Sequence, residues 1–106
     1  MTAEDGGVPI ACSLDAASLG DLADEWHALG ATSVTAMEAG ATAVRLVLRD
    51  SDAALTSAAA LAQREKQCCA FFEVSIALEA DRRTLVLTVP HGAEEALAAF
   101  VALLSA

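Results

Sequence analysis

The sequence predicts a two-layer α+β fold in which helices cover one face of a β-sheet. Apolar and polar residues alternate in several short segments, and apolar residues recur every three or four positions in three longer ones. The two kinds of segment follow the order β-α-β-β-α-β-β-α, and strands that are apolar on one side require one covering layer. The first six elements match a ferredoxin-like βαββαβ order, to which we expect an added strand and a C-terminal helix.

The residue patterns also define the individual elements. Alternating segments predict strands at residues 8–13, 32–38, 44–49, 74–78 and 85–89. Helical spacing predicts helices over residues 15–29, from about 51 to 68, and from 94 toward the end of the chain. We expect Gly30 to end the first helix, Asp50 or Ser51 to cap the second, and Cys12 to share the core-facing side of the first strand.

Length and composition fit one globular domain. The chain has 106 residues, of which 56% are hydrophobic and 20% charged, enough to bury a single core. We expect a disordered N-terminal tail at residues 1–7 and a single α+β domain at residues 8–106. The tail is acidic and lacks the basic and apolar regions of a signal peptide, which predicts a cytoplasmic protein.

Charge and cysteine content exclude several functions. The net charge of −9, with only six basic residues, excludes a nucleic-acid partner, because phosphate binding requires a basic face. No apolar run has the length of a membrane-spanning helix. The three cysteines cannot all form disulfides within one chain, so in a reducing compartment we expect thiols or metal ligands.

The end of the second helix carries the strongest chemical signal. At about 100° per residue, Glu65 falls in the middle of the apolar stripe. Cys69 lies one turn later on the same line, and Cys68 is displaced toward one margin. A carboxylate directed at a core is costly unless it is paired, protonated or bound to a ligand.

Three interpretations of Glu65 remain open from the sequence. In the first, the helix end is peripheral and Glu65 reaches water or an arginine such as Arg45. In the second, burial raises the pKa of the carboxyl, which then acts as a general acid or base beside a thiol. In the third, Glu65 binds a metal ion together with the cysteines.

The position of the cysteines favours ligation over nucleophilic attack. Both Cys68 and Cys69 lie at a helix C-terminus, where the helix dipole disfavours a thiolate, whereas a soft metal ion supplies positive charge itself. Cys12 is a third candidate ligand. A ferredoxin-like order places Cys12 and the cysteine pair at opposite edges of the sheet, however, and the sequence does not resolve this conflict. Neither His27, expected at the surface, nor His91, expected at a helix start, has zinc-site spacing to the cysteines.

Two short motifs resemble a group of small bacterial proteins. These proteins carry an E-x-x-C-C-x-F-F run and an I-A-C-[ST]-L start, which correspond here to Glu65 through Phe72 and to Ile10 through Leu14. Ala70 stands where a proline is common in the group. Related segments accompany heavy-metal-type regulators, so the resemblance implies thiol or metal chemistry. It implies no catalytic residue.

The leading hypothesis is a cytoplasmic, thiol-bearing domain that binds a soft metal ion, such as Zn(II), Cu(I) or Hg(II), or a small thiophilic ligand. Its candidate ligands are Cys68, Cys69, Cys12 and Glu65. The first alternative is a non-enzymatic, homodimeric interaction module with structural cysteines. The second alternative is a small thiol redox enzyme, which the helix dipole disfavours.

Overall fold

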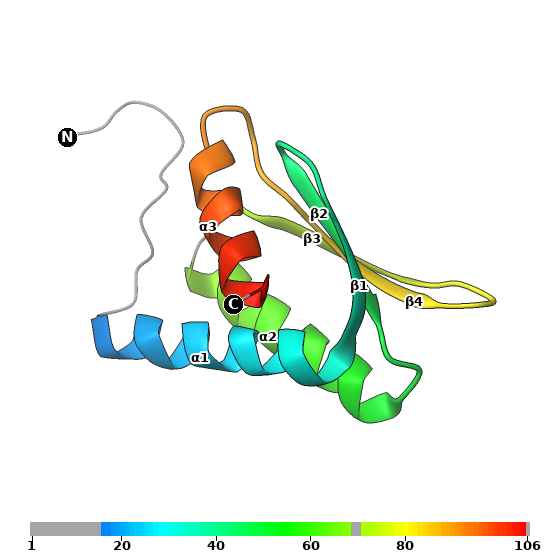
Figure 1. Cartoon of the computed structure of the whole chain (residues 1–106). Helices are drawn as coiled ribbons and strands as arrows, with labels where there is room; N and C mark the ends of the chain where they lie inside the picture. The colour runs from blue at the N-terminus through cyan, green and yellow to red at the C-terminus, as the bar shows by residue number, and fades with distance from the viewer. Residues whose placement is uncertain (1–15, 69–70, 106) are drawn as a thin grey trace.

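Seven elements form in residues 16–68 and 71–105, which the computed structural model describes. In chain order they are α1 (Ala16–Ser33), β1 (Val34–Ala39), β2 (Ala43–Leu48), α2 (Asp52–Cys68), β3 (Glu73–Leu78), β4 (Arg83–Thr88) and α3 (Glu94–Ser105). The strands form one antiparallel sheet in the order β1-β2-β4-β3. Figure 1 shows the three helices on one side of this sheet. The α+β class with one covered face is therefore confirmed. The expected tail at 1–7 and strand at 8–13 lie outside the described residues.

Local hydrogen bonds close the two hairpins in the intervals between the predicted strands and cap α2 at one of the two residues that the sequence predicts. The amide of Gly40 donates to the Ala43 carbonyl at 2.8 Å in the first hairpin, and the amide of Glu79 donates to the Arg82 carbonyl at 2.8 Å in the second. Ser51 caps α2, because its hydroxyl oxygen accepts a hydrogen bond from the Ala54 amide at 3.0 Å.

The core lies between the two central strands and the helices. Leu46 of β2 stands directly opposite Leu85 of β4, and both side chains are completely buried. Trp26 of α1 and Leu97 of α3 are buried against this layer. The alternation in β2 and β4 correctly predicts which side of each strand faces the helices.

None of the helices in residues 16–68 and 71–105 is both long and apolar enough to cross a membrane.

The prediction that Gly30 ends the first helix is wrong. α1 continues to Ser33, so β1 begins at Val34 rather than at residue 32. A Cβ atom at Gly30 would lie 2.6 Å from the backbone oxygen of Leu104, closer than real Cβ contacts. Gly30 therefore allows α1 and α3 to approach closely, and the glycine that resembles a helix stop is an interhelical contact.

The apolar side of β3 is less buried than its alternation predicts. Ile76 is 39% exposed and Leu78 is 68% exposed, although Ile76 stands opposite the buried Leu85. β3 is an edge strand, and the β3–β4 hairpin extends past the helices in Figure 1. The covering layer thus reaches the central strands but leaves the outer end of β3 uncovered.

Candidate functional site

The buried carboxyl of Glu65 is the centre of the candidate site. Glu65 lies in the penultimate turn of α2 and is only 7% exposed. The indole Nε1–H of Trp26, a residue with no exposed surface, donates a hydrogen bond to Glu65 Oε1 at 2.9 Å. The helical wheel correctly places Glu65 within the apolar stripe. The interpretation in which Glu65 reaches water or Arg45 is wrong, because Arg45 is exposed on the opposite face of the sheet.

Burial dominates the electrostatics of this carboxyl. Loss of hydration raises the pKa of Glu65 above its ordinary value, and the hydrogen bond from Trp26 partly opposes that rise. An ionised carboxylate is stabilised by charge-assisted donors or by a cation. Among the described residues, the indole of Trp26 supplies the hydrogen bond to this group. The carboxyl is therefore a costly feature that packing alone does not require.

All four aromatic side chains of the protein form one continuous run that ends at this carboxyl. Phe71 stacks on Phe72 with ring centroids 4.8 Å apart, and Phe72 contacts Phe100 at 5.8 Å. Phe100 meets the Trp26 ring edge to face at 4.8 Å. The two phenylalanines stack because they precede β3 in a turn, instead of pointing to opposite faces as an extended segment would require. The run connects α1, α3 and the segment after α2.

Two adjacent contacts connect α1 and α2 beside the site. On the inner side, Trp26 binds Glu65, and on the outer side Arg64 Nη1 contacts both carboxylate oxygens of Glu25 at 2.7 Å. The outer ion pair is about half exposed, so it adds only about 0–1 kcal/mol. The buried pair therefore has the larger effect on how the two helices fit together.

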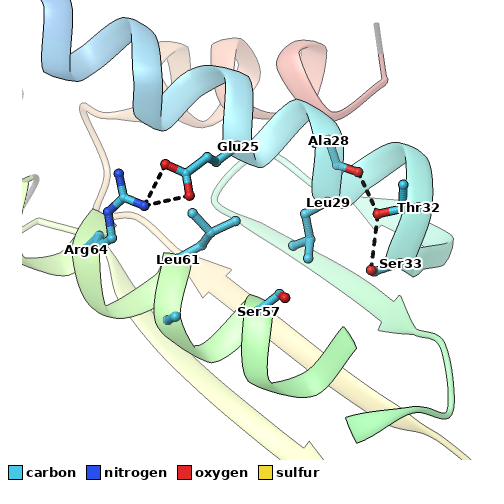
Figure 2. Close-up of a pocket in the computed structure, with 9 residues that line it drawn as sticks. Glu25, Ala28, Leu29, Thr32, Ser33, Ser57, Leu61 and Arg64 are labelled. Carbon is cyan, nitrogen blue, oxygen red and sulfur yellow. Dashed lines mark hydrogen bonds and ion pairs between the residues drawn. The ribbon is translucent and has the colours of Figure 1, made fainter. Parts of the chain in front are cut away.

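A groove of about 330 Å³ follows the boundary between α1 and α2. Figure 2 shows the Glu25–Arg64 pair at one end and Thr32 and Ser33 toward the other, with Leu29 and Leu61 between them. The two charged groups neutralise one another, and the Thr32 hydroxyl donates to the Ala28 carbonyl at 2.8 Å within its own helix. The groove therefore offers hydrocarbon and internally bonded polar groups, and we assign it no ligand.

The structure describes only part of the cysteine prediction. Cys68 is the last residue of α2, three positions after Glu65, so the predicted helix end is confirmed. Cys12 and Cys69 lie outside the described residues. Within residues 16–68 and 71–105, no group of three or more His, Cys, Asp or Glu side chains is positioned to hold a metal ion. The ligand set therefore remains a prediction.

The histidines serve local structure. The Nδ1 atom of His27 lies 3.1 Å from the carbonyl oxygen of Leu103, which connects α1 to α3 and leaves the side chain partly buried rather than at the surface. His91 is exposed just before α3, where it lies 3.4 Å from Glu94, as expected for a helix-start residue.

The sequence did not identify Trp26 as the partner of Glu65. The two residues are 39 positions apart, and hydrophobic periodicity places a tryptophan in the core without revealing what its N–H group binds. The available signal was the combination of a single tryptophan and a carboxylate, each on the apolar stripe of its helix. A buried indole N–H usually finds an acceptor.

Comparisons with known proteins add no assignment to this geometry. The chain matches no protein-family model, no curated protein and no solved structure.

Proposed function

We propose that this protein is a cytoplasmic, thiol-bearing domain that binds a soft metal ion, or a related thiophilic ligand, at the C-terminal end of α2. Cys68 and Cys69 are the proposed ligands, Cys12 is the third candidate, and Glu65 is a ligand or a neighbouring acceptor. The observation that supports the proposal is the buried Glu65 carboxyl, which lies on α2 three residues before Cys68, the last residue of that helix.

A bound cation would offset the cost of burying Glu65. The carboxylate has two oxygens, and the indole of Trp26 bonds to Oε1. A metal ion beside the other oxygen would favour the ionised form, which burial alone disfavours. The cation would also neutralise the partial negative charge of the helix C-terminus, where a free thiolate is disfavoured. Soft ions such as Zn(II), Cu(I) and Hg(II) match thiolate ligands.

Titration of the reduced full chain with each of these three ions tests the proposal. We expect Cys68→Ser and Cys69→Ser each to weaken binding, whereas Gln67→Ser, an exposed change on the same helix turn, leaves binding unchanged. Glu65→Gln should weaken binding less than loss of a thiolate if the carboxyl is a neighbouring acceptor. Binding that is equally strong in all four variants would contradict the proposal.

The exposed residues of β3 favour a second candidate function, a homodimeric interaction module. Val47 and Val86, which lie on the face of the sheet away from the helices, are partly buried. Ile76 and Leu78 on the helix-covered face are the exposed large hydrophobic side chains of the described residues. Analytical ultracentrifugation distinguishes the candidates, because a stable dimer with unreactive thiols supports the module and a monomer with metal-binding thiols supports the metal site.

We also propose that the sheet is a permuted version of the ferredoxin-like arrangement. In a βαββαβ order, the first strand lies between the strand that precedes the second helix and the strand that follows it. β4 has that position here, between β2 and β3. Removal of residues 1–13 should therefore leave the sheet intact by circular dichroism, and loss of cooperative unfolding in the shortened chain would contradict this assignment.

A further inference from the structure

Two adjoining hollows surround the start of β3. They have volumes of about 260 and 420 Å³, and both border Glu73 of β3 and Thr88 of β4, which stand directly opposite one another in the sheet. The smaller hollow also borders Phe71 and Pro90, and the larger one borders Lys66 and Ser75. Because the hollows share two side chains, we treat them as one cleft, the Glu73 cleft, whose size suits a small molecule.

The smaller hollow has the chemistry of a site for an organic ammonium group. Glu73 is exposed, and in the part of the chain that the structure describes its carboxylate forms no hydrogen bond or ion pair. Phe72 stacks on one face of the partly buried Phe71 ring, which leaves the other face and the ring edge beside the hollow. Carboxylates and aromatic faces both attract cations. The Thr88 hydroxyl adds a further acceptor at the same place.

The larger hollow has a positive and a negative group on its walls. Lys66, in the last turn of α2, and Glu73 both border it. The two side chains do not form an ion pair with each other, since the Glu73 carboxylate has no such contact within residues 16–68 and 71–105. In the groove between α1 and α2, by contrast, Glu25 and Arg64 neutralise one another at 2.7 Å. The Glu73 cleft therefore offers two charges of opposite sign to a ligand that carries both.

We propose that the Glu73 cleft binds a small zwitterion, an amino acid whose ammonium group lies between Glu73 and Phe71 and whose carboxylate reaches Lys66. Three N–H donors allow the Lys66 ammonium to bind this carboxylate in addition to the contact that it already has. The net charge of −9 disfavours a ligand that is only anionic, whereas it attracts an ammonium group. The site is built from residues other than the proposed metal ligands, so this inference does not depend on the metal site.

Calorimetric titration of the reduced full chain with γ-aminobutyrate tests the cleft. We expect saturable binding with a dissociation constant on the order of a millimolar, because a small ligand makes only a few contacts and these are partly hydrated. Butylamine lacks the carboxylate and should bind about threefold more weakly, since it loses one exposed ion pair. Butyrate lacks the ammonium group and should bind at least about tenfold more weakly.

Substitutions at the two charged residues distinguish the two ends of the ligand. Glu73→Gln should weaken the binding of γ-aminobutyrate and of butylamine by about tenfold, whereas Lys66→Met should remove the preference for γ-aminobutyrate over butylamine. Glu38→Gln is the matched control, because it removes the same charge from an exposed position on the other edge strand and should leave binding unchanged. Circular dichroism should show both glutamate variants folded, since neither side chain is buried.

Titration of the same variants with Zn(II) separates this site from the proposed metal site. Glu73→Gln should leave Zn(II) binding unchanged, and a loss of Zn(II) binding in this variant would assign Glu73 to the metal site and overturn the zwitterion site. The absence of saturable γ-aminobutyrate binding, or binding that is equally strong in Glu73→Gln and Glu38→Gln, would also overturn the zwitterion site but leave the metal site standing.

Discussion

At the scale of single residues, the hydrogen bond between Trp26 and Glu65 is the feature that most distinguishes this core from an ordinary one. A buried carboxyl that loses its donor retains its desolvation cost, whereas a buried apolar pair loses only packing. Replacing only Trp26 should therefore lower the free energy of unfolding more than the same replacement does when Glu65 is also made apolar.

Trp26→Phe should destabilise the protein by about 1–3 kcal/mol beyond its effect on packing, because the Glu65 carboxyl is left without its donor. Urea unfolding at neutral pH measures this cost. In a Glu65→Leu background the same substitution should cost less, since no carboxyl remains to be left unsatisfied. Equal costs in the two backgrounds would show that the hydrogen bond makes no contribution.

Glu65→Gln should change how stability depends on pH. Because burial raises the pKa of Glu65 in the folded state, its contribution to stability is fully present below the unfolded value of about 4.5 and is lost as the pH rises through the folded pKa. Glutamine does not titrate. The stability of Glu65→Gln relative to the natural chain should therefore increase from acid toward neutral pH. Urea unfolding across this range measures the difference, and a difference that is constant or falls with pH would contradict the burial effect.

At the scale of elements, the sequence predicts strands and helices well where one periodicity dominates. β2, β4 and α2 lie where alternation and helical spacing place them, and Ser51 caps α2 as expected. Gly30 shows why other boundaries fail. From local sequence alone, a glycine after an apolar stripe indicates the end of a helix. Here a glycine is needed at this position because the backbone of Leu104 in α3, 74 residues later, leaves no room for a Cβ atom.

Gly30→Ala should destabilise the protein even though alanine is the better helix former. The added Cβ would meet the Leu104 backbone at 2.6 Å, so α1 and α3 must move apart. Gly20→Ala is the matched control on the same helix, because Gly20 is exposed and has nothing within 4 Å of the added Cβ. It should stabilise the protein by roughly 0.5–1 kcal/mol. We expect the midpoint temperature of thermal unfolding to fall in Gly30→Ala and to rise in Gly20→Ala. A rise in both variants would contradict the close contact between α1 and α3.

At the scale of the whole molecule, the exposure of β3 follows from how far the helices reach across the sheet. Alternation in Val74, Ile76 and Leu78 correctly predicts their shared face but cannot predict whether a helix covers it. In the candidate site, too, some features are predictable from a single element and others depend on tertiary packing. The inward direction of Glu65 was predictable from one helix, whereas its contact with Trp26 depends on the packing of two helices, which local sequence does not encode.

The proposed metal site and the buried core are connected through Trp26, which is the only tryptophan in the chain and therefore reports on Glu65 directly. The proposed metal site is tested most directly by titrating the reduced full chain with Zn(II) while the fluorescence of Trp26 is recorded. We expect an emission change that saturates and that is lost in Cys68→Ser and Cys69→Ser but retained in Gln67→Ser. Emission that does not respond to metal, or that responds equally in the cysteine variants, would contradict it.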